Sequence, residues 1–111
     1  MSATIYHNPR CSKSREALRL LQDAGADVRV VEYLKAPPMS AELRALYARA
    51  GMAVRDGLRM AEPEAQALAT ADEAAILTAM AANPALIERP LVATEKGVVL
   101  ARPPERVRDI L

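Results

Sequence analysis

Apolar and polar residues recur with helical spacing in three stretches of the chain. In the first stretch, the small and aliphatic positions lie three or four residues apart: Ala17, Leu18, Leu21 and Ala24. The pattern begins at Ser14, and Gly25 stands where a glycine commonly ends a helix. We therefore expect an amphipathic helix between these two residues.

The other two helical stretches lie in the middle of the chain. Ser40 is the expected N-cap of one helix, which ends at Gly51. Residues 70–73, Thr-Ala-Asp-Glu, have the spacing of a capping box, and the helix that follows stops at residues 83–84, Asn-Pro. Between these helices, residues 52–69 are less regular because a glycine and a proline interrupt them. We expect short helical turns there.

Short runs of β-prone residues predict four strands, at Thr4–Tyr6, Val28–Val31, Leu91–Ala93 and Val98–Leu100. The first two flank the first helix, which predicts a βαβ unit with parallel strands and a right-handed crossover. The last two predict an antiparallel hairpin, for which Gly97 is expected to supply a positive φ. A last short helix is expected to open at Pro103-Pro104.

Composition narrows the class of protein. The 111 residues are 51% hydrophobic but only 3% aromatic, so we expect one domain, residues 1–111, with an aliphatic core. The net charge of +1 provides no general attraction for nucleic acid or an anionic membrane. No apolar run approaches the roughly 18–20 residues of a membrane span. The single cysteine forms no internal disulfide and the first residues lack signal-peptide features, so we expect a cytoplasmic protein.

The candidate chemistry is concentrated in residues 7–15, His-Asn-Pro-Arg-Cys-Ser-Lys-Ser-Arg. Cys11 is expected between the end of the first strand and the start of the first helix. Amide N–H groups and the helix dipole stabilise a thiolate there, and the charges of Lys13 and Arg15 add to that effect. A lone cysteine can equally be an inert buried thiol. The polar and basic neighbours of Cys11 favour the nucleophile.

Other polar residues have more than one interpretation. His7 can act as a base, tune the thiolate or serve as a structural hydrogen-bonding residue, and the Ser14 hydroxyl can donate a hydrogen bond. One cysteine and one histidine cannot complete a zinc site, so no metal is expected. The chain has no nucleotide-phosphate loop, and no bound cofactor is expected. Arginines near breaks in the pattern are either surface charges or substrate ligands.

Four motifs, in this order and spacing, carry a resemblance to a known family. They are residues 6–15 (YHNPRCSKSR), 33–38 (YLKAPP), 88–92 (ERPLV) and 101–105 (ARPPE). Over essentially its whole length the chain resembles the glutaredoxin-coupled arsenate reductases. The resemblance implies an α/β, thioredoxin-like (glutaredoxin-like) fold, with a small mixed four-stranded sheet, flanking helices and a helical insertion at about residues 39–83.

The resemblance also assigns roles to single residues. Cys11 corresponds to the family's nucleophile, and Arg59, Arg89 and Arg102 correspond to its oxyanion-binding arginines. Pro90 corresponds to the cis-proline that precedes the third strand in this fold.

Residues close to the nucleophile complete the expected site. Ser14, Arg15 and His7 are expected to stabilise the thiolate. Ser14 occupies the second cysteine position of a Cys-x-x-Cys motif, so the protein needs an external thiol. Arg10 departs from the family, whose well-known members carry a small residue at this position.

The implied reaction is the reduction of arsenate to arsenite by a monomer that uses glutathione as co-substrate and glutaredoxin as partner. Two alternatives stay open. One is an Spx-like regulator of the same fold, which binds RNA polymerase. The other is a glutathione-dependent thiol oxidoreductase that acts on another substrate.

Overall fold

The structure is a computed structural model that describes residues 1–111 and divides into two compact units. The first unit combines Met1–Ala36 with Arg89–Leu111, and the second is Pro37–Glu88. The segment expected as a helical insertion, at about residues 39–83, lies inside the second unit. No helix in the chain combines the length and apolarity that a membrane crossing requires.

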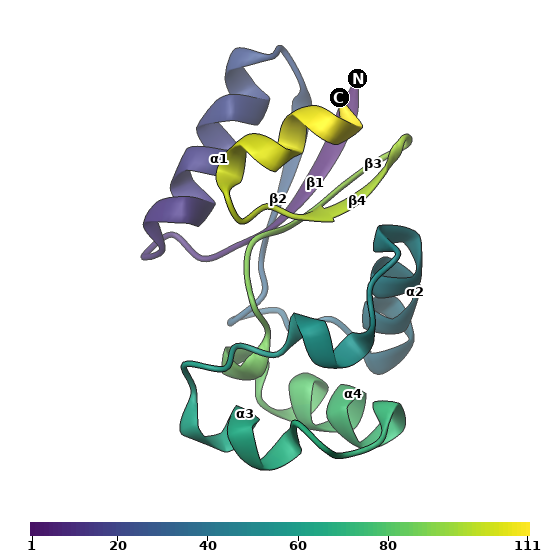
Figure 1. Cartoon of the computed structure of the whole chain (residues 1–111). Helices are drawn as coiled ribbons and strands as arrows, with labels where there is room; N and C mark the ends of the chain where they lie inside the picture. Colours follow the sequence, from purple (N-terminus) through teal and green to yellow (C-terminus); the bar gives the residue numbers. More distant parts are fainter. The chain divides into compact units, whose positions relative to one another are not determined.

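The first unit contains the predicted mixed sheet of four strands (Figure 1). The strands are β1 (Ser2–His7), β2 (Asp27–Glu32), β3 (Leu91–Thr94) and β4 (Gly97–Leu100), in the order β2-β1-β3-β4. β1 pairs parallel with β2 and antiparallel with β3, and β3 pairs antiparallel with β4. The parallel pair and the hairpin are confirmed, and together they form a thioredoxin-like sheet.

Two helical elements pack with this sheet around an aliphatic core (Figure 1). They are α1 (Ser12–Asp23) and the 3₁₀ helix η3 (Pro104–Ile110). The core contains Ala3, Ile5, Ala17, Leu21, Val92, Val99, Ala101, Val107 and Ile110. Burial of each large aliphatic side chain is worth about 1.5–3 kcal/mol. This core fixes α1, and therefore its first turn, against the end of β1.

Gly25 follows α1 with a φ of 80°, which confirms it as the residue that ends the helix. The start of α1 was predicted too late, because the helix begins at Ser12 and not at Ser14. Cys11 is its N-cap, with extended backbone angles. The apolar pattern does not reach this first turn, whose buried side chain is the polar Ser14. The nucleophile therefore lies at the helix boundary itself.

The prediction for Gly97 was wrong, because this residue has no positive φ. Gly97 begins β4 and pairs with Thr94, and the Thr94 hydroxyl accepts the N–H of Lys96 at 3.1 Å. The same hydroxyl donates to the carbonyl of Ile110 at 2.6 Å. A Cβ at Gly97 would lie 3.3 Å from the Ile110 side chain. The close approach of η3, and not the turn, thus explains why residue 97 is a glycine.

The second unit consists of helical elements, as expected. They are α2 (Ser40–Ala50), η1 (Val54–Gly57), α3 (Pro63–Leu68), α4 (Glu73–Ala82) and η2 (Pro84–Leu86). α2 ends at Gly51, whose φ is 67°, and α4 ends before Asn83. An isolated antiparallel bridge joins Leu58 to Ile87, so the segments on either side of α3 and α4 meet within this unit.

The predicted N-caps of α2 and α4 were wrong. Met39 holds the N-cap position of α2, and the hydroxyl of Ser40 donates instead to the backbone of Leu77 in α4, at 3.3 Å. At α4 the cap is Asp72, whose carboxylate accepts the N–H group three residues later at 2.8 Å. The carboxylate is a strong N-cap and takes the place of the threonine at the predicted capping box.

We expect Gly57→Ala to destabilise the protein. The added Cβ would overlap the ring of Tyr47, whose hydroxyl in turn donates to the sulfur of Met80 at 3.8 Å. Overpacking of a core costs about 1–3 kcal/mol, which thermal unfolding will detect as a lower midpoint. The double variant Gly57→Ala/Tyr47→Leu is the control, because it removes the ring. If Gly57→Ala and Tyr47→Leu lower the unfolding midpoint additively, the overlap with the Tyr47 ring is not the cause of the destabilisation.

Candidate functional site

Cys11 is held by a tight turn between β1 and α1. Its N–H donates to the carbonyl of Asn8 at 3.0 Å, and its own carbonyl accepts the N–H of Arg15 at 3.0 Å. The residue is 7% exposed. The turn therefore places the thiol at the first N–H groups of the helix, with a small part of its surface open to a reactant.

The surroundings of Cys11 favour its thiolate. Burial raises the pKa of the thiol, but the backbone N–H of Ser14 and the positive charge of Arg89 lower it. The backbone N–H of Lys13 and a hydrogen bond from Arg89 lower it further, and the net pKa lies below the usual value. A lower pKa means more thiolate at neutral pH, which is the reactive form. The N–H groups at the start of α1 and one arginine distant in the sequence thus lower the pKa of Cys11 together.

The side chains of Ser14 and His7 connect the first turn of α1 to the end of β1. The Ser14 hydroxyl is fully buried, accepts the N–H of Asn8 at 3.0 Å and lies 2.7 Å from Nδ1 of His7. Burial lowers the pKa of His7, although Glu32 raises it. His7 is therefore neutral at neutral pH. Both residues hold the loop, and Ser14 acts on the sulfur through its backbone.

Arg15 and Arg10 contact the same loop in different ways. The guanidinium of Arg15 donates to the carbonyl of Pro9 at 3.0 Å, and its charge lowers the pKa of His7. The backbone N–H of Arg10 donates to Oδ1 of Asn8 at 3.0 Å, and the guanidinium of Arg10 takes no part in this hydrogen bond. The structure thus gives Arg15 a contact that braces the loop.

The structure brings Arg89 to Cys11 and Arg102 to Arg89. Arg102 donates from its guanidinium to the carbonyl of Arg89 at 3.0 Å. Both arginines precede a proline, and both the Arg89–Pro90 and the Arg102–Pro103 peptide bonds are cis. The second cis bond was not expected from the sequence. One hydrogen bond, from the side chain of Arg102 to the backbone of Arg89, thus joins the two predicted oxyanion ligands of the first unit.

Arg59 belongs to the second unit, where it follows η1. Its N–H donates to the carbonyl of Leu86 at 2.8 Å, and its guanidinium lies 3.6 Å from the carboxylate of Glu62. Its Nε is buried without a hydrogen-bond partner. A buried donor without an acceptor is costly, and an oxyanion would supply one. Its role in binding remains a prediction.

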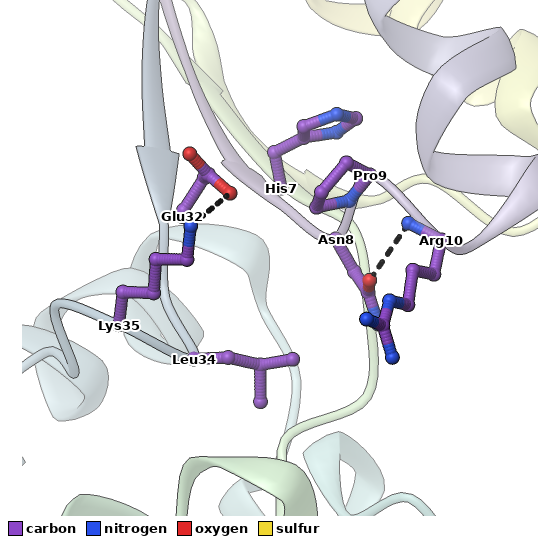
Figure 2. A pocket seen from close by; sticks show the side chains of 7 residues that line it. All are labelled: His7, Asn8, Pro9, Arg10, Glu32, Leu34 and Lys35. Carbon is purple, nitrogen blue, oxygen red and sulfur yellow. Dashed lines mark hydrogen bonds and ion pairs between the residues drawn. The ribbon is translucent and has the colours of Figure 1, made fainter.

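A pocket of about 240 Å³ opens beside the loop that leads to Cys11 (Figure 2). Residues from β1, the loop and the end of β2 line it: His7, Asn8, Pro9, Arg10, Glu32, Leu34 and Lys35. Sequence reasoning assigned no role to the last three. The available signal was the parallel pairing of β1 and β2, because the carboxyl ends of parallel strands meet at one edge, where ligands commonly bind.

No group of three or more histidine, cysteine, aspartate or glutamate side chains is placed to hold a metal ion. The site is built instead from one thiol, helix N–H groups and arginines. Such a set can hold an anion next to a nucleophile, because each donor stabilises negative charge.

Comparisons with known proteins agree on one family. A family model described as the ArsC family matches residues 6–110. An arsenate reductase of Rhizobium meliloti (strain 1021) is 44% identical, and the alignment covers 100% of this chain and 82% of the relative. Protein YfgD of Escherichia coli (strain K12), described as uncharacterized, is 45% identical over 96% of this chain and 94% of its own length. A solved structure of an arsenate reductase from Vibrio cholerae has a TM-score of 0.93 and 42% identity, covering 100% of this chain and 98% of that one.

Proposed function

Since this chain belongs to the ArsC family, we propose that it reduces arsenate to arsenite, with Cys11 as the nucleophile. One observation carries the proposal. The pKa of Cys11 is lowered at the start of α1, where Arg89 also acts on the sulfur. A thiolate next to a guanidinium suits an anionic electrophile, because the cation stabilises both partners of the reaction.

The proposed reaction has two covalent steps. First, the Cys11 thiolate attacks arsenic, a sulfur–arsenic bond forms, and one arsenate oxygen leaves as water after protonation. A second thiolate then attacks the Cys11 sulfur, and the electron pair of the sulfur–arsenic bond stays with arsenic. Arsenic is reduced from As(V) to As(III) and leaves as arsenite. The two sulfurs are oxidised to a disulfide.

The second thiol must come from outside the chain, because Cys11 is its only cysteine. Glutathione is the proposed co-substrate, and a glutaredoxin then reduces the mixed disulfide on Cys11. Both thiols stay reduced in a cytoplasm, which is the proposed location. No bound cofactor is needed, because the thiols supply both electrons, and a monomer suffices for this scheme.

The oxyanion ligands are proposed to be Arg59, Arg89 and Arg102. Arg89 already lowers the pKa of Cys11, and Arg102 holds the backbone of Arg89. Arg59 has a buried Nε without an acceptor. Arginine suits this role because its planar donors match the oxygens of a tetrahedral anion.

The test is a coupled assay with the purified protein, arsenate, glutathione, glutaredoxin, glutathione reductase and NADPH. We expect NADPH oxidation that depends on arsenate and on the protein, and that falls when either glutathione or glutaredoxin is left out. Phosphate in place of arsenate is the control, because it has the same shape but is not reduced. Turnover no greater than without the protein would contradict the proposal.

A further inference from the structure

The pocket beside the β1–α1 loop is the part of the site that the proposed reaction does not use. Cys11 itself does not line it, but the residue before it, Arg10, does (Figure 2). The groups that lower the pKa of Cys11 are Ser14, Lys13 and Arg89, and not Arg10. A charged side chain next to the nucleophile therefore lines this pocket and is not among the groups that act on the sulfur.

The charges of this pocket are available to a ligand. The Arg10 guanidinium has no ion pair or hydrogen bond to another side chain. Nζ of Lys35 lies 3.8 Å from Oε1 of Glu32, and 79% of the lysine side chain and 44% of the glutamate side chain are exposed. Exposed ion pairs of this kind contribute little binding energy. Leu34 is 45% exposed and adds an apolar surface. In Figure 2, Arg10 and Lys35 lie on opposite sides of the pocket.

A ligand that matches this set has two anionic groups, one cationic group and some apolar surface. Glutathione has two carboxylates, one ammonium group and a short carbon chain. We propose that the pocket binds the thiol co-substrate of the reaction, with Arg10 and Lys35 holding the carboxylates of glutathione and Glu32 its ammonium group. This inference rests on the proposed function, because it assigns a place to the second thiol of that reaction.

The reach of the ligand fits the position of the pocket. The Cα atoms of Arg10 and Cys11, as neighbours in the chain, are about 3.8 Å apart, and a tripeptide extends over roughly 10 Å. The backbone of Cys11 is therefore within the length of one tripeptide from the backbone of Arg10, as the proposed attack of the glutathione sulfur on the Cys11 sulfur requires. In that step the sulfur–arsenic bond breaks, arsenic keeps the electron pair, and arsenite leaves.

Arsenate fits this pocket less well than glutathione does. The volume of about 240 Å³ is large for one tetrahedral oxyanion, given that a water molecule takes up about 30 Å³ in the liquid. The carboxylate of Glu32 and the apolar surfaces of Leu34 and Pro9 also disfavour a small dianion. The Cys11 sulfur and Arg89, the arginine that acts on it, form the oxyanion side of the proposed site.

The test measures the reaction of Cys11 with oxidised glutathione, without arsenate. The thiolate attacks one sulfur, the disulfide bond breaks, and one glutathione thiolate leaves. The product carries the same glutathionyl group on Cys11 as the proposed reaction does, so the same pocket is occupied. We expect Arg10→Gln/Lys35→Gln to slow this reaction by about fivefold to tenfold, because two charge contacts are lost. Mass spectrometry follows the modification.

Three controls make the test specific. Arg29→Gln removes an exposed charge of β2 outside the pocket and is expected to leave the rate unchanged. The neutral reagent 2-hydroxyethyl disulfide should modify the double variant at the wild-type rate. Equal slowing with this reagent, or with the small dianion 3,3′-dithiodipropionate, would overturn the proposal, because the effect would then be one of thiol reactivity or of general attraction. An unchanged rate with oxidised glutathione would also overturn it. Since no arsenate is present, these outcomes are independent of arsenate reduction.

Discussion

Cys11→Ser is expected to abolish arsenate reduction. A hydroxyl is not ionised at neutral pH and cannot form the sulfur–arsenic bond or the mixed disulfide. Removal of a nucleophile in other enzymes costs on the order of 10⁶ in turnover, so we expect a loss of at least about 10³-fold, down to the background of the coupled assay. The assay compares NADPH oxidation by the variant and by the wild type at equal concentration.

The same variant is expected to be at least as stable as the wild type. Cys11 is the N-cap of α1 and makes no side-chain capping hydrogen bond. Serine is among the preferred N-cap residues, and a good cap is worth about 0.5–2 kcal/mol. A helix start that favours serine for stability but carries cysteine is consistent with selection for thiol chemistry.

Two measurements separate this loss from unfolding. The midpoint of thermal unfolding should not fall in Cys11→Ser, and wild-type protein blocked at Cys11 with iodoacetamide should lose activity to the same extent. Retained turnover in either sample would show that the reaction does not pass through this thiol. Wild-type protein without arsenate-dependent turnover would instead favour a binding protein of the Spx-like kind, for which RNA polymerase retained equally by wild type and variant is the matching result.

The sequence was sufficient to predict the elements that local patterns define. The spacing of Leu18 and Leu21 predicted α1, and the β-branched residues of β2 predicted its parallel partner strand. The signal of α1 is strong because Ala17 and Leu21 on one of its faces are buried in the core, whereas β2 contributes only the partly buried Val28 to it. Cys11 could be located for the same reason, since a strand followed by a helix fixes the place of the residue between them.

The errors arose where a tertiary contact decides between local alternatives. Ser40 has the chemistry of an N-cap, but its hydroxyl reaches α4 instead. Gly97 is suited to a turn, but the close approach of Ile110 explains it. In each case the residue type was compatible with two roles, and only the packing selects one.

The distant arginines needed more than local patterns. Arg89 is 78 residues from Cys11 along the chain, by the difference of the two numbers, and a short-range pattern carries no information on such a contact. Only the resemblance to a family connected them before the structure. The pocket of Arg10 and Lys35 was missed for a related reason, because the parallel pairing of β1 and β2 brings its two sides together.

Arg89→Gln is expected to weaken both the nucleophile and the binding of its substrate. The positive charge of Arg89 lowers the pKa of Cys11, so its removal should raise that pKa toward the free-thiol value of about 8.5. The midpoint of Cys11 alkylation by iodoacetamide should therefore move to higher pH. A midpoint higher by one pH unit means about a tenfold loss of thiolate at neutral pH. The missing oxyanion donor should lower kcat/KM for arsenate by about 10²-fold or more.

Arg89→Lys separates the effect on the Cys11 pKa from the effect on arsenate binding, and Arg106→Gln is the control. Lysine keeps the charge but not the planar donors, so the alkylation midpoint should stay close to that of the wild type while kcat/KM for arsenate remains low. Arg106 is exposed and donates only to the carbonyl of Leu100, at 3.2 Å, so its replacement should change neither quantity. If Arg89→Gln leaves the alkylation midpoint where it is, the charge of Arg89 does not stabilise the thiolate. The N–H groups at the start of α1 would then be the cause of the lowered pKa, and Arg89 would contribute to arsenate binding alone.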